Sequence, residues 1–92
     1  MDVTHQPDVQ EFSALLEGHR AELQYRLHDG VMTIVHTGVP DEIGGRGVAA
    51  ELTRVALETA RDNGWKVVPA CAYAEVFMRR HPEYADLLRQ ER

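Results

Sequence analysis

Three glycines fall within four positions, between a strand-like segment and the longest helical pattern of the chain. The stretch reads Ile43, Gly44, Gly45, Arg46, Gly47, Val48, Ala49. Glycine has no Cβ and adopts positive φ at little cost, so the backbone of such a loop can approach a ligand closely. A helix that begins there also presents N–H groups and the positive end of its dipole, which favour phosphate. The stretch predicts a pyrophosphate-binding loop, with an ordinary glycine-rich connection as the alternative.

Two common phosphate-binding motifs do not match this loop. No Lys followed by Ser or Thr comes after Gly47, which excludes a P-loop. Gly44, Gly45 and Gly47 do not have the spacing of the dinucleotide-binding fingerprint either. The rest of the chain must therefore indicate which phosphate-bearing ligand the loop would hold.

Length and charge exclude several classes of protein. Ninety-two residues suffice for one hydrophobic core, so we expect a single domain over residues 1–92. The formal net charge of −5 argues against nucleic-acid binding. The apolar runs are too short for a membrane span and no signal peptide is recognisable, so we expect a cytoplasmic protein without membrane contact. One cysteine and no zinc-type histidine spacing predict neither an internal disulfide nor a metal site.

The first half of the chain has the pattern of an antiparallel meander. Residues 1–8 are polar without a period and are expected to form a loose arm. Residues 9–16 fit both helical and strand spacing. Residues 21–28 alternate apolar with polar, and residues 31–39 are rich in β-branched side chains, which predicts two strands. Between them, Asp29 and Gly30 predict a type I′ hairpin turn.

The second half alternates helix and strand. Apolar residues recur at helical spacing over 47–63, and Gly64 is the expected helix stop. Residues 65–70 read as a short buried strand, 72–80 as a second helix and 83–89 as a last helical turn or two. Strand, helix and strand over this length imply a right-handed crossover between parallel strands. The predicted fold class is α/β (α+β).

Four segments, in order and at plausible spacing, resemble the short single-domain branch of the GNAT N-acetyltransferase superfamily. They are residues 36–40 (HTGVP), 45–49 (GRGVA), 68–73 (VPACAY) and 80–84 (RHPEY). The resemblance implies a GNAT-like acyl-CoA acyltransferase fold, in which residues 9–16 form a strand. It also implies acetyl-CoA as cosubstrate and transfer of acetyl to a primary amine of a small molecule or a protein lysine.

The resemblance further implies a set of cofactor contacts. The backbone of residues 37–39 would hydrogen-bond the pantetheine arm, residues 43–49 would hold the phosphates, and the Tyr73 hydroxyl would lie near the thioester. The implied cofactor-binding residues are Thr37, Gly38, Val39, Ile43, Gly44, Gly45, Arg46, Gly47, Val48, Ala49 and Tyr73. The superfamily usually has Arg or Gln where this chain has Gly44, so Arg46 must supply the loop's side-chain charge.

Two residues are candidates for the chemistry of acetyl transfer. By the resemblance Cys71 lies beside the thioester, as an acid toward the CoA sulfur or as a nucleophile, with a buried core residue as the alternative. Histidine changes protonation state near neutral pH, so His36 is a candidate general base, with an outward-facing strand residue as the alternative. Both end neighbouring parallel strands and could form a pair. Arg79 and Arg80 could contact the CoA 3′-phosphate or simply face solvent.

Rival functions stay open on the sequence alone. A degenerate member of the same fold would bind acyl-CoA or a protein partner without turnover. A thiol redox protein using Cys71 would lack a second cysteine to resolve it. The acceptor amine cannot be read from the chain, and exposed strand edges in a small sheet are compatible with a monomer or a weak homodimer.

Overall fold

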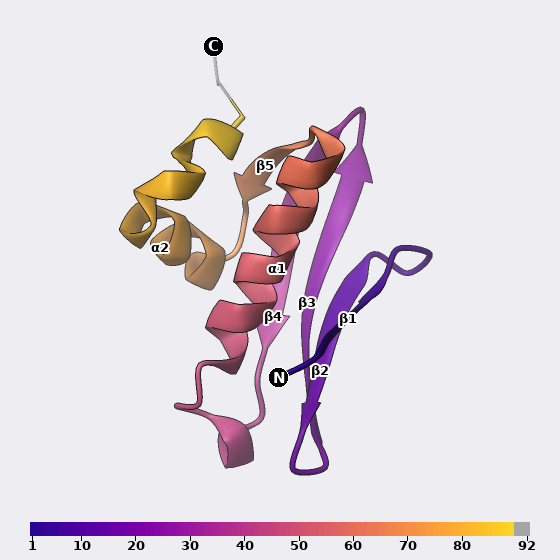
Figure 1. Ribbon diagram of the computed structural model, residues 1–92, viewed down its shortest axis with the longest axis vertical. Helices are drawn as coiled ribbons and strands as arrows, with labels where there is room; N and C mark the ends of the chain where they lie inside the picture. Colours follow the sequence, from indigo (N-terminus) through magenta and orange to yellow (C-terminus); the bar gives the residue numbers. More distant parts are fainter. Residues whose placement is uncertain (90–92) are drawn as a thin grey trace.

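The alternating first half of the chain forms a meander of antiparallel strands in the computed structural model, which describes residues 1–89 (Figure 1). The strands follow one another across the sheet in sequence order, and the last strand joins β4 in parallel. Their bounds are β1 Val3–Gln6, β2 Glu11–Leu16, β3 His19–His28, β4 Val31–Gly38 and β5 Lys66–Pro69. The result is a mixed five-stranded sheet, as expected from the predicted meander and parallel crossover.

The connection from β4 to β5 is the long helix α1, Val48–Asn63, which lies across one face of the sheet (Figure 1). A short 3₁₀ helix η1, Asp41–Ile43, precedes it, and Gly64 with φ 72° ends it in the predicted left-handed conformation. After β5 follow α2, Ala72–Arg80, and the 3₁₀ helix η2, Pro82–Leu87. Within residues 1–89, none of these helices has the length and apolar character needed to traverse a bilayer.

The hydrophobic core lies between α1 and the sheet. At the centres of β2, β3 and β4 every second residue points toward α1 and is buried, as the period of a half-buried strand requires. The fully buried members from these four elements are Phe12, Ala21, Leu23, Met32, Ile34, Leu52, Ala56, Leu57 and Ala60. The opposite side of the sheet, called here the outer face, carries partly exposed polar side chains such as Glu22, Gln24 and Arg26.

The predicted hairpin turn between β3 and β4 is confirmed. Asp29 and Gly30 have φ of 51° and 74°, the two positive values that a type I′ turn requires. The strand expected over residues 9–16 is also present as β2. It begins two residues late because Gln10 has φ 56° and belongs to the preceding turn.

The loose arm expected over residues 1–8 is wrong, because Val3–Gln6 form β1 at the edge of the sheet. β1 pairs with β2 in antiparallel register, with His5 opposite Phe12. The His5 ring stacks on Phe12 at 4.1 Å, and its Nε2 lies 2.6 Å from the Tyr25 hydroxyl oxygen. These contacts are made by residues far along the chain, so the polar segment itself gave no sign of them.

Candidate functional site

The C-terminal half of β4 places consecutive side chains on different faces of the sheet. Tyr25 pairs with Ile34, but Gln24 pairs with His36, so Val35 is an extra residue and forms a β-bulge. Cross-strand partners share a face. His36 therefore points to the outer face with Gln24, and Thr37, opposite Leu23, points toward α1.

β4 and β5 part near the same point. Their parallel pairing ends where Ile34 meets Pro69, and the Ala70 N–H donates to the Ile34 carbonyl at 2.9 Å. Beyond this bond β4 continues to Gly38, whereas the chain after β5 turns into α2 at Ala72. Cys71 lies at this turn, half-buried, as the N-cap residue of α2.

The expected pair of Cys71 with His36 is replaced by two separate pairs. The Cys71 Sγ lies 3.6 Å from the Thr37 Oγ1, and the His36 Nε2 lies 3.1 Å from Glu22 Oε2 on the outer face. The bulge at Val35 is the physical reason, because it directs His36 to the outer face and brings Thr37 to the side where the thiol lies. This correction concerns the pair; the roles of Cys71 and His36 stay proposals.

His36 belongs to a group of charged side chains on the outer face. Its imidazole is about half exposed at 51%, and the carboxylate of Glu22 is 24% exposed. Arg20 Nη1 lies 3.8 Å from the other oxygen of Glu22, and Arg20 Nη2 donates to Glu11. Glu11, Arg20, Glu22 and His36 are called here the outer-face cluster.

On the other side, the glycine stretch borders a hollow of about 240 Å³, called here the loop hollow. Gly45 and Gly47 have φ of 76° and 77°, and Gly47 is the N-cap residue of α1. Gly47 has no side chain to cap the first N–H groups of α1, so these remain available to a ligand. The residues that line the hollow are Val39, Ile43, Gly44, Gly45, Gly47, Val48, Ala49, Ala50 and Tyr73.

Most of the residues expected from the sequence to contact the cofactor line the loop hollow. Ala50 also lines it, and the sequence reasoning missed this residue. Tyr73 borders it from α2, and burial raises the pKa of its hydroxyl, so this group stays a donor near neutral pH. Thr37 and Gly38 are instead the last residues of β4, where Thr37 faces Cys71 and Gly38 lies opposite Glu22.

Arg46 does not line the loop hollow. Its guanidinium pairs with Glu17 in the turn between β2 and β3, and both side chains are exposed. This hydrogen bond lowers the pKa of Glu17 and raises that of Arg46. In this structure the loop therefore offers backbone groups, while the charge that the sequence assigned to it is held by a carboxylate 29 positions away.

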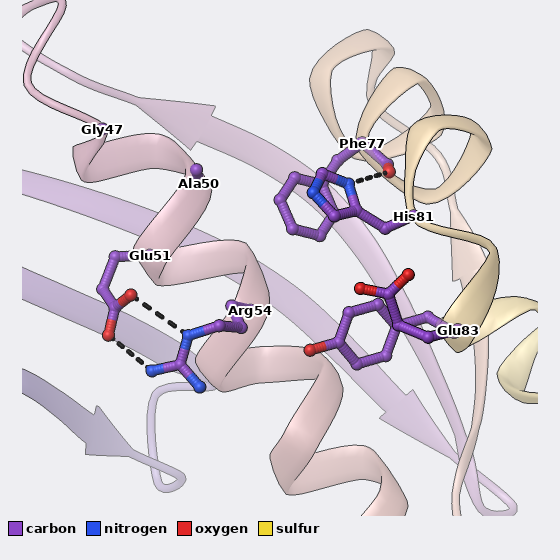
Figure 2. Close-up of a pocket in the computed structure, with 8 residues that line it drawn as sticks. Gly47, Ala50, Glu51, Arg54, Phe77, His81 and Glu83 are labelled. Atoms are coloured by element: carbon purple, nitrogen blue, oxygen red, sulfur yellow. Dashed lines mark hydrogen bonds and ion pairs between the residues drawn. The ribbon is translucent and has the colours of Figure 1, made fainter.

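A second hollow of about 190 Å³ adjoins the first, since Gly47 and Ala50 line both (Figure 2). Figure 2 shows the His81 ring against Phe77, and Arg54 bound to Glu51 on α1. The centroids of the two rings lie 4.0 Å apart. The second hollow is lined by Gly47, Ala50, Glu51, Arg54, Phe77, His81, Glu83 and Tyr84. Sequence reasoning missed this hollow. The available signal was the spacing of Gly47 and Arg54, which are two helical turns apart and therefore lie on the same face of α1.

Arg79 and the two acidic residues that precede the glycines line neither hollow. Arg79 pairs with Glu75 at 3.3 Å, four residues earlier on α2, and both side chains are exposed. Asp41 and Glu42, which precede the glycines, are exposed on η1. Among residues 1–89 there is no group of three or more His, Cys, Asp or Glu arranged to hold a metal ion.

Comparisons with known proteins agree on one family. The family model described as GCN5-related N-acetyl-transferase matches residues 11–87, which include both hollows and the outer-face cluster. Protein NATD1 of Mus musculus is 31% identical over 83 residues, covering 87% of this chain and 76% of NATD1. Protein NATD1 of Homo sapiens is 30% identical over the same length, covering 87% and 74%.

A solved structure shares the fold. The solution structure of a GCN5-like protein from Staphylococcus aureus matches with a TM-score of 0.76 and 28% sequence identity. The match covers 99% of this chain and 90% of that one, so it extends over the sheet and all helices described above.

Proposed function

The chain belongs to the GCN5-related N-acetyltransferase family, and from this premise we propose that it transfers the acetyl group of acetyl-CoA to a primary amine. The observation that carries the proposal is the loop hollow, where the start of α1 and two glycines with positive φ meet a tyrosine hydroxyl. The hollow lies next to the point where β4 and β5 part and where Cys71 is held.

Acetyl-CoA would lie along three parts of this surface. Its pyrophosphate would accept hydrogen bonds from the backbone of residues 45–49 at the start of α1. The pantetheine arm would follow the end of β4 at residues 37–39 toward the Cys71 thiol. The nucleotide would extend into the second hollow, where the stacked rings of Phe77 and His81 lie across from the ion pair of Arg54 with Glu51.

In this proposal two groups on opposite sides of β4 take part in the chemistry, His36 from the outer face and Cys71 from the side of α1. The amine nitrogen attacks the thioester carbonyl, the carbon–sulfur bond breaks, and the proton that the amine loses goes to the His36 imidazole. The thiolate of CoA leaves with a proton from the Cys71 thiol, which Thr37 Oγ1 holds at 3.6 Å. Solvent then returns a proton to Cys71, so no covalent intermediate on the protein is needed.

A second candidate is a module that binds acyl-CoA without turnover. The observation that favours it is the ion pair of Arg46 with Glu17, which leaves the glycine loop without a side-chain cation beside the exposed carboxylates of η1. Such a module would bind acetyl-CoA but would not acetylate any amine.

Calorimetric titration with acetyl-CoA and with pantetheine tests the binding step. We expect micromolar binding of acetyl-CoA and much weaker binding of pantetheine, because the phosphates supply most of the contacts. Gly45→Ala, at φ 76°, should weaken acetyl-CoA binding at least tenfold by obstructing the loop. No binding at millimolar acetyl-CoA would overturn the proposal.

Gly30→Ala is the matched control for that substitution. Gly30 has φ 74° and nothing within 4 Å of an added Cβ, as at Gly45, but it lies in the hairpin turn between β3 and β4. Both variants carry the same backbone strain of about 1–2 kcal/mol. Only Gly45→Ala should change affinity. Acetylation of Nα-acetyl-lysine amide by wild type then separates the enzyme from the silent binding module.

A further inference from the structure

Glu22 and Gly38 lie opposite each other on β3 and β4, both on the outer face. A Cβ added at Gly38 would lie 2.5 Å from Glu22 Oε2 and 2.9 Å from His36 Nε2. Both distances are shorter than real Cβ contacts allow, so a Cβ at position 38 would displace the ends of these two side chains. The contact between the Glu22 carboxylate and the His36 imidazole therefore occupies the space that any other residue at position 38 would fill.

From this arrangement we propose that Glu22 is a positioning residue for His36. This inference rests on the proposed acetyl transfer. The Nε2–H of His36 donates to Glu22 Oε2 at 3.1 Å, which leaves the Nδ1 lone pair free to take the proton of the amine. When Nδ1 takes that proton, the imidazolium keeps its hydrogen bond to a carboxylate that is already in place.

The rest of the outer-face cluster adds a positive charge on the other side of the Glu22 carboxylate. The second oxygen of Glu22, Oε1, faces Arg20 at 3.8 Å, so each carboxylate oxygen has its own partner. Arg20 is in turn bound to Glu11. The guanidinium is shared between two carboxylates, and Oε2 is left to the histidine.

The Glu22–His36 pair differs from an ordinary surface ion pair in its surroundings. Exposed pairs hold two long side chains loosely and tolerate changes beside them. Here the Glu22 side chain is only 24% exposed, that of His36 is 51% exposed, and the pair lies over a glycine, the one residue type without a Cβ. The bulge at Val35 brings His36 to the same face as Gly38 and Glu22, so three features of the sheet converge on one imidazole.

The tautomer of His36 is the direct test, measured by long-range ¹H–¹⁵N NMR of the imidazole at a pH where it is neutral. We expect wild type to carry the proton on Nε2 only. Glu22→Gln and Gly38→Ala should each give a mixture of tautomers, whereas Thr33→Ala, a control on the same face of β4, should not. A mixture in wild type would overturn the proposal.

Turnover of Nα-acetyl-lysine amide with acetyl-CoA provides the second readout. Glu22→Gln should lower kcat about tenfold, less than the roughly 10²–10⁴ that a general base itself contributes, and leave the KM for acetyl-CoA unchanged. In a His36→Gln background the same substitution should cost nothing more. An equal loss in both backgrounds would show that Glu22 does not act through His36.

Failure of the proposed function gives a different result. If wild type acetylates no amine, the proposal of acetyl transfer is overturned, and the catalytic role of Glu22 is overturned with it. The tautomer of His36 in wild type still shows whether its hydrogen bond to Glu22 exists. If wild type is active and the losses add, only the positioning role is overturned. The two failures are therefore distinguishable in one set of samples.

Discussion

The two edges of the sheet are built by different means. Around β1, β2 and β3 the structure is held by large rings, with His5, Phe12 and Tyr25 in mutual contact at centroid distances of 4.1 to 5.8 Å. At the ends of β4 and β5 the same chain uses glycines, a bulge and half-exposed polar side chains. The packed aromatic rings lie at the first edge, and the proposed chemistry lies at the second.

The difference has a physical basis. Rings buried against each other gain apolar contact and leave no room for a ligand. A binding loop instead needs backbone groups that no other part of the fold has satisfied. Substitutions at the ring edge should therefore change the free energy of unfolding, and those at the loop edge should change binding or turnover. Four experiments examine that division, from the largest effect to the smallest.

Phe12→Ala should have the largest effect of all. Phe12 is fully buried between His5 and Tyr25, and truncating such a ring costs about 3–5 kcal/mol. Domains of this size have roughly 5–15 kcal/mol in total, so urea denaturation should show a barely folded protein. The milder Phe12→Leu should stay folded and bind acetyl-CoA as wild type does. Weakened binding in Phe12→Leu would break the division between the two edges.

Cys71→Ala should have the opposite profile. Removing the thiol takes away the proposed acid beside Thr37 and should lower kcat about a hundredfold, within the range for general acid catalysis. The free energy of unfolding should change little, because Cys71 is only half-buried. Acetyl-CoA affinity should stay the same by calorimetry. Unchanged turnover would mean that Cys71 has only the structural role that the sequence analysis gave as its alternative.

Arg46→Glu examines the loop at a smaller scale. It breaks the pair with Glu17 and adds a third carboxylate group to the exposed acids near the glycines. Acetyl-CoA affinity should fall about tenfold at low salt and less at high salt, because exposed charges are screened. Pantetheine binding should not change. Arg26→Glu, with the same charge change on β3, is the control, and an equal loss in both variants would count against a local effect.

The same contrast explains what could be predicted from the sequence. Local patterns placed the hairpin turn at Asp29 and the stop of α1 at Gly64, because each depends on residues adjacent in the chain. The parallel crossover followed from the order strand, helix, strand, since such connections are right-handed and parallel. The glycine loop was located for the same reason. The sheet, the crossing helix and the loop hollow were therefore within reach of sequence reasoning.

Features that depend on distant residues were not. β1 is held by contacts of His5 with Phe12 and Tyr25, and the polar sequence of this segment does not predict them. The bulge at Val35 leaves no mark in a β-branched run, so the pairing of Cys71 with His36 was wrong. Glu22 was missed as a partner of His36 because they are 14 residues apart and meet only through the register of β3 and β4.

The smallest effect concerns pH and the ring edge. Burial lowers the pKa of His5 below its ordinary value, so the folded protein takes up this proton at a lower pH than the unfolded chain does. Between those two values the unfolded chain binds more protons, and the free energy of unfolding must rise with pH. Stability should thus be complete above about pH 6.5, the ordinary value for histidine, and fall on acidification until the folded protein also protonates.

Urea denaturation between pH 5 and 8 measures this slope, and His5→Gln isolates it. The other four histidines are present in both proteins, so the difference between the two curves belongs to His5. We expect the wild-type curve to drop relative to the variant below pH 6.5, by less than the roughly 1 kcal/mol of a hydrogen bond. Parallel curves would mean that the pKa of His5 is the same in the folded protein as in the unfolded chain. A drop accompanied by loss of acetyl-CoA affinity would mean instead that the two edges are coupled, because protonation at β1 would then reach the loop through α1.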